Sequence, residues 1–200
     1  IVDQLGNKVD VGAFVSVFAA PVKTSSGPVT KLALEWNATP SATLYNTNGA
    51  AAYAGLVSSL SPEEGTTYKP IPGITEAVRL TETQASNLLT YRLTTMVNRA
   101  KGYVVAKGVT GAYKVTDYQK SDFTQLTTVR ITHAAIDQVR NICEQYIGEP
   151  MNGPSLNAMQ KAIDGGLRSM LLAGAITRYD FSVESSPNQR VLGQSTVNLT

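Results

Sequence analysis

Chemically versatile side chains are scarce in this sequence, which has one cysteine and one histidine among 200 residues. A single cysteine excludes an intramolecular disulfide, and together with one histidine it is too few for a Cys/His zinc site. Charged residues make up only 16% of the chain, and 17 basic residues against 15 acidic ones leave a net charge of +2. This balance is too even for a protein that binds nucleic acid electrostatically.

Long apolar runs are absent as well. No run approaches the roughly 18 residues that a membrane-spanning helix needs, so we expect no direct membrane insertion. Nothing at the start of the chain resembles a secretory signal peptide. The sequence begins at Ile1 rather than Met and stops at Thr200 within a strand-like pattern. We therefore expect an internal or C-terminal piece of a longer protein.

Apolar residues make up 42% of the chain, which is enough for a packed core, and 22 threonines replace much of the missing charge. Their patterning predicts a mixed α/β (α+β) fold, with a central mixed sheet flanked by helices and with extended terminal strands able to pair with neighbouring subunits. Residues 1–49 are expected to hold strands and a connecting loop. Residues 50–200 are expected to form an α/β domain that is compact together with the preceding strand.

The predicted elements follow from apolar periodicity and turn residues. Thr81 and Gln84 fit a capping box at the start of a helix. In the longest predicted helix one apolar face recurs at steps of three and four, through Leu126, Val129, His133, Ile136, Arg140, Cys143 and Ile147. Helices are predicted at 50–60, 81–92, 122–147 and 155–172, the last with an inner stripe of Leu156, Met159, Ile163, Leu167 and Met170. Strands are predicted at 9–18, 29–36, 102–106, 175–183 and 191–200.

Candidate catalytic groups have structural explanations. His133 lies on the apolar stripe, which favours a packed core residue over a general base. Cys143 on the same stripe is ten residues away, too far for a nucleophilic pair within one helix, and we interpret it as a buried structural thiol. Glu63 and Glu64 lie in a Pro/Gly loop as solvated charge. With no nucleophile elbow, phosphate loop or metal-ligand spacing, we expect no cofactor, no metal and no catalytic residue.

Two further features are left with alternatives. Arg140 needs an acceptor for its guanidinium. Its side chain can extend past the edge of the core, pair with a carboxylate of its own subunit, or bind an acceptor on a neighbouring subunit. Gly165 and Gly166 indicate either close helix packing or a weak point in their helix.

Assembly is the function class that the residues favour most. Strand-like segments lie at both ends of the chain, and the last has no evident partner in sequence. An unpaired strand edge is a template for another chain. The alternative is a monomer whose terminal strands pair with each other. Strands shared between subunits would include Val9, Val11, Val15, Val17, Val191, Val197 and Leu199.

The order of several segments resembles the tail sheath proteins of contractile bacteriophage tails and related injection machines. Each stretch alone is common, and their order and spacing carry the resemblance, which covers most of residues 50–200. These stretches are Ala50–Leu56 with the Pro/Gly loop after it, Leu80–Leu89, Gly102–Ala106, Ser121–Ile131, and Leu171–Ile176 leading into Tyr179–Val183.

The resemblance implies a structural, non-enzymatic subunit of a virion. Such subunits polymerise as stacked rings, commonly six-fold, around an inner tube and contract to drive it through the target envelope. The implied partners are other copies of the chain, an inner tail tube protein, and baseplate and tail terminator proteins. The implied location is the phage tail, assembled in the bacterial cytoplasm. This chain would be the inner-layer region, with Lys161, Asp164 and Arg168 as candidate tube-facing residues. A globular protein-binding domain and an enzyme of unknown chemistry are the alternatives.

Overall fold

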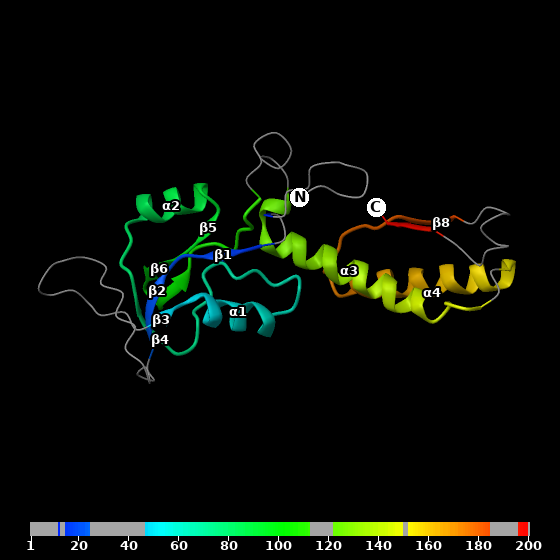
Figure 1. Ribbon diagram of the computed structural model, residues 1–200, viewed down its shortest axis with the longest axis horizontal. Helices are drawn as coiled ribbons and strands as arrows, with labels where there is room; N and C mark the ends of the chain where they lie inside the picture. Colours follow the sequence, from blue (N-terminus) through cyan, green and yellow to red (C-terminus); the bar gives the residue numbers. More distant parts are fainter. Residues whose placement is uncertain are drawn as a thin grey trace, which may run out of the picture. The chain divides into compact units, whose positions relative to one another are not determined.

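The structure is a computed structural model that describes residues 12, 15–24, 47–112, 122–149, 152–184 and 196–199 (Figure 1). The chain divides into two compact units, Ile1–Val129 (unit 1) and Arg130–Thr200 (unit 2). Helices and strands occur together, which confirms the predicted α+β class. Within the described residues the strands form four small sheets instead of one central sheet.

The strands of unit 1 are short and come from distant parts of the sequence. β1 (Val17–Phe18) pairs in parallel with β5 (Leu93–Thr94), and β2 (Pro21–Thr24) lies between β3 (Thr47–Asn48) and β4 (Ile74–Ala77), antiparallel to both. β6 (Met96–Arg99) and β7 (Gly102–Val105) form a hairpin, which confirms the predicted strand at 102–106. The predicted strand at 29–36 lies outside the described residues.

The core of unit 1 is built on alternate residues of the chain through β1 and β2. Phe18, Ala20 and Val22 are buried, as the period-two pattern of a strand requires. The ring of Phe18 stacks on Tyr53, with centroids 4.8 Å apart. Gly49 packs directly against these residues, and its backbone amide donates to Ala20 O (3.0 Å). The position has no room for a side chain.

Two helices accompany these strands. α1 (Ala50–Ser59) contributes only Tyr53 as a fully buried side chain, so its small residues are less packed than their size indicates. α2 (Glu82–Thr90) begins with the predicted capping box, which is confirmed. The Gln84 amide donates to Thr81 Oγ1 (3.3 Å), and the Thr81 amide donates to Gln84 Oε1 (2.9 Å).

Unit 2 packs two long helices against a β-hairpin. α3 (Leu126–Glu144) and α4 (Gly153–Leu172) are followed by β8 (Phe181–Glu184) and β9 (Thr196–Leu199). The predicted inner stripe of α4 is confirmed, since Leu156, Met159, Ile163 and Leu167 are buried and Met170 packs against them. Gly166 lies against α3, where an added Cβ would come within 2.6 Å of Ile142 Cδ1, whereas Gly165 faces open space.

The predicted stripe of the long helix is confirmed at Leu126, Val129 and Cys143 and wrong at His133, Arg140 and Ile147. Within unit 2, Ala135 and Val139 are buried and Ile142, Cys143 and Tyr146 pack beside them. His133 and Arg140 are exposed instead, and Ile147 is 79% exposed. The first residue of the predicted stripe, Leu126, packs against the core of unit 1. Within unit 2 the buried line of α3 therefore runs one residue before the predicted one, a rotation of about 100° around the helix.

Candidate assembly surfaces

The predicted N-terminal interaction strand is only partly described. Val15 and Val17 are 50% and 44% exposed, while Phe18 points inward. The backbone here is engaged within the chain, because Val17 pairs with Leu93 and Val15 O accepts from the Gly111 amide at 2.6 Å. Exposed apolar side chains are therefore what these two residues offer to a partner. Val9 and Val11 lie outside the described residues.

The predicted C-terminal strand has a partner in its own chain, which corrects the expectation that it lacks one. β9 pairs antiparallel with β8, with Leu199 opposite Phe181 and Val197 opposite Val183. Val197 packs against the core of unit 2, so its side chain faces inward. Among the described residues this sheet has two strands, so each strand keeps one edge without a described partner. Val191 lies outside that part of the chain.

The three candidate tube-facing residues differ in their surroundings. Lys161 and Arg168 are exposed on α4, and Leu172, 80% exposed, follows one turn after Arg168. Asp164 is instead occupied within unit 2, where its Oδ1 accepts a hydrogen bond from the Tyr179 hydroxyl at 2.8 Å. Lys161 and Arg168 thus remain available to a partner, while Asp164 holds the chain that follows α4 against the helix.

The Tyr179–Asp164 bond predicts a pH dependence. The hydrogen bond to Asp164, followed by burial and the negative charge of Asp164, raises the pKa of Tyr179 above its ordinary value. Because the folded state retains the proton longer than the unfolded state, the bond's contribution is complete below the ordinary tyrosine pKa and is lost as alkaline pH rises through the raised one. NMR titration of labelled tyrosine rings should show Tyr179 ionising late. Asp164→Asn should return it towards the ordinary range, and an unchanged titration in that variant would contradict the assignment.

The candidate catalytic residues do not assemble into a reactive site. His133 is exposed, so its interpretation as a core residue is wrong. Arg140 lies 4.0 Å from Asp137 one turn earlier, with both side chains about 70% exposed, which agrees with the own-subunit alternative. Cys143 is partly buried against the core of unit 2, short of the full burial that was predicted. This burial raises the pKa of its thiol, which lowers the thiolate fraction at neutral pH.

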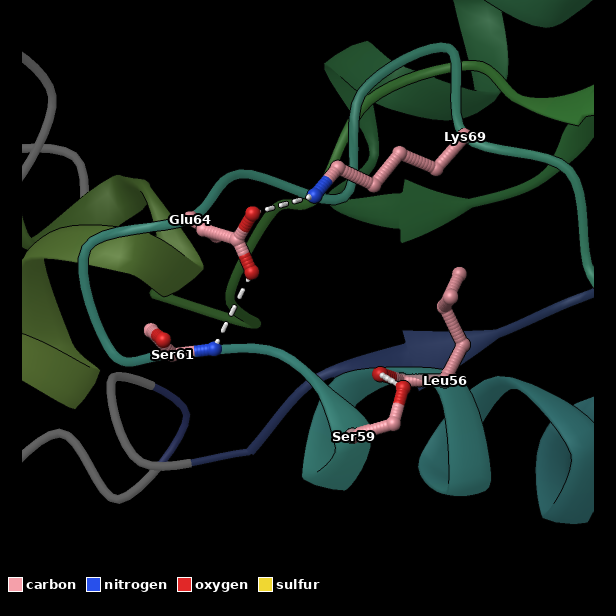
Figure 2. A network of polar contacts seen from close by, with 5 residues as sticks. All are labelled: Leu56, Ser59, Ser61, Glu64 and Lys69. Atoms are coloured by element: carbon pink, nitrogen blue, oxygen red, sulfur yellow. Dashed lines mark hydrogen bonds and ion pairs between the residues drawn. The ribbon is translucent and has the colours of Figure 1, made fainter.

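In the acidic pair of the Pro/Gly loop, Glu64 has a structural role. Figure 2 shows the Glu64 carboxylate accepting from the Ser61 amide and from Lys69 Nζ, each at 3.2 Å. These contacts close the loop that follows α1. Since both charged side chains are partly exposed, the ion pair itself contributes little to stability.

Two exposed apolar residues were missed by the sequence analysis. Ile147 was assigned to the inner stripe of the long helix, and Leu172 was not singled out. Leu172 lies five residues after Leu167, off the three-and-four spacing of the buried stripe, which is a signal that could have identified it. In the described part of the chain, no cluster of three His, Cys, Asp or Glu residues could hold a metal, and no helix is long and apolar enough to span a membrane.

Most of this chain has the fold of solved sheath tail proteins. The crystal structure of the sheath tail protein of Listeria innocua matches 94% of this chain with a TM-score of 0.70 and 16% identity, over 46% of its own length. The sheath tail protein of Desulfitobacterium hafniense matches 86% of this chain with a TM-score of 0.65 and 16% identity, over 38% of its length.

A component of the anti-feeding prophage baseplate, in a cryo-EM structure symmetrised six-fold, matches 94% of this chain with a TM-score of 0.70 and 16% identity. The match covers 50% of that component, so this chain spans half or less of the length of each of these three structures. No family model and no curated protein matches the sequence.

Proposed function

We propose that this chain is the inner-layer part of a sheath subunit of a contractile injection system. Its subunits polymerise as stacked, six-fold rings around an inner tube and contract to drive that tube through a target envelope. The observation that carries the proposal is the likeness of fold to sheath tail proteins over 94% of the chain, with a TM-score of 0.70. In a phage, the place of such a subunit is the tail of the virion, assembled in the bacterial cytoplasm.

The β8–β9 hairpin supports assembly by strand addition. A neighbouring copy that adds a strand to an edge of this sheet gains main-chain hydrogen bonds, which do not depend on side-chain identity. Main-chain pairing of this kind can hold copies together while side-chain contacts exchange during contraction. The energy of contraction then comes from the difference between two packings of the same subunits.

The α4 surface supports contact with the tube. Lys161 and Arg168 lie seven residues apart, which places both on one exposed face of α4. Their positive charges suit an acidic strip on the tube protein. Baseplate and terminator proteins would then contact the two ends of the stacked rings.

Assembly can be tested with the full-length gene product. Purified protein should form rings or tubes in negative-stain microscopy, and a monodisperse monomer would contradict the proposal. Val17→Lys should shorten or abolish these polymers, because it places a charge on an exposed apolar position of the predicted N-terminal interaction strand. Tyr91→Lys, at a 66% exposed position at the end of α2, is the matched control and should leave polymers intact. Normal polymers from Val17→Lys would remove Val17 from the interaction surface without removing the sheath function.

A further inference from the structure

The chain enters the described part of unit 1 along a segment that is bonded to residues 108–111. Val15 O accepts from the Gly111 amide at 2.6 Å, and Ser16 Oγ donates to Val109 O at 2.7 Å. The two backbones approach so closely at Gly111 that an added Cβ would lie 3.2 Å from Gly12 O and 3.4 Å from Val15 O. A side chain at residue 111 would therefore push the two segments apart.

Residues 108–111 are bonded on another side to the segment that leads into α3. The Thr110 amide donates to Thr124 O (3.0 Å), Thr110 Oγ1 donates to Phe123 O (2.7 Å), and the Leu126 amide donates to Gly108 O (3.3 Å). Val109 and Thr110 are 3% and 0% exposed, so the side of these bonds that residues 108–111 contribute is largely shielded from water. The same four residues thus join the incoming strand to the start of α3.

We propose that residues 108–111 are a mechanical clasp that carries tension between the segment entering at Val15 and helix α3. A pull on the chain before Val15 reaches α3 through the clasp, without first passing through the sheet β3-β2-β4. The use of the clasp in an assembly rests on the proposed sheath function. The clasp itself is a property of one molecule, so it can be tested whether or not the chain polymerises.

The test is single-molecule force spectroscopy in two pulling geometries. With handles at both termini, force crosses the clasp. With one handle at the exposed Lys101, in the turn between β6 and β7, and the other at the C-terminus, force bypasses Ser16. In the first geometry Ser16→Ala should raise the unfolding rate at fixed force by about fivefold, the factor expected for one net hydrogen bond. In the second geometry it should leave the rate unchanged.

Ser59→Ala is the matched control, because it removes a hydroxyl bond of similar length, to Leu56 O at 2.8 Å, outside the clasp (Figure 2). It should change the rate in neither geometry. Ser16→Thr keeps the hydroxyl, so it should unfold at the rate of the unmodified chain in both geometries. It provides a second measurement of the clasp if Ser16→Ala refolds poorly. Equal effects of Ser16→Ala in both geometries, or no effect between the termini, would overturn the clasp.

Discussion

Replacing Ile163 with alanine is expected to lower the free energy of unfolding of unit 2 by about 2–5 kcal/mol. Ile163 is 0% exposed at the centre of the α4 stripe, between Met159 and Leu167, and it is part of the cluster that joins both long helices to the β8–β9 hairpin. Truncation would remove three carbons and leave a cavity that rigid neighbours cannot close. Urea unfolding followed by circular dichroism, with hydrogen exchange of α3 and α4 peptides, would measure the loss.

Leu172→Ala is the control on the same helix. Leu172 is 80% exposed, so its truncation should change the free energy of unfolding by no more than about 0.5 kcal/mol. Hydrogen exchange should also place the loss from Ile163→Ala in unit 2, leaving peptides from unit 1 as protected as before. Similar losses from both variants would show that burial in the α4 stripe is not what stabilises this unit.

Gly49→Ala should destabilise unit 1 by about 1–3 kcal/mol through overpacking. The added Cβ would lie 2.5 Å from Phe18 Cε1, 3.1 Å from Val22 Cγ1 and 3.2 Å from Ala20 O. The Phe18 ring cannot turn away easily, because it is buried and stacked on Tyr53. The clash therefore affects both the core and the backbone at Ala20. Thermal unfolding together with hydrogen exchange of β2 peptides would measure the loss of stability.

The control for Gly49→Ala is Gly55→Ala in the helix that Gly49 precedes. A Cβ at residue 55 meets nothing within 4 Å, and alanine favours the helix over glycine by about 0.5–1 kcal/mol. The two substitutions add the same methyl group yet should shift stability in opposite directions. Stabilisation by both substitutions would mean that Phe18, Ala20 and Val22 can move away from residue 49 without loss of stability.

Local signals in the sequence predicted the helices well. The Thr81–Gln84 capping box and the α4 stripe are confirmed because each is set by a few neighbouring residues. Prediction failed where contacts with distant parts of the chain determine which residues are buried. The α3 stripe is wrong at His133, Arg140 and Ile147, because the prediction extended the spacing from Leu126, which packs in unit 1, and passed over Ala135, whose small side chain gives a weak signal.

The strands were harder to predict because their partners are remote in sequence. The two residues of β1 pair with β5, 76 residues later, and no local pattern reveals that register. The strand predicted at 175–183 begins only at Phe181, although its alternation is correct for Tyr179, Phe181 and Val183, which pack inward. Of the assembly residues, the sequence identified exposed positions such as Val17 and Lys161, but it could not show that Asp164 is held by Tyr179.

The threonines buried in unit 1 have a consequence for how its sequence can diverge. Thr94, Thr95 and Thr110 are fully enclosed, and their hydroxyls bond to Val109 N, Ala19 O and Phe123 O in place of the longer ladders that two-residue strands cannot supply. Valine has nearly the same shape but would leave the main-chain partner of each hydroxyl without this hydrogen bond, and in the case of Val109 N the unpaired group would be buried. Serine would keep the bond and lose only a methyl group. Among natural variants, hydroxyl residues should therefore persist at these three positions even where the surrounding aliphatic residues interchange freely.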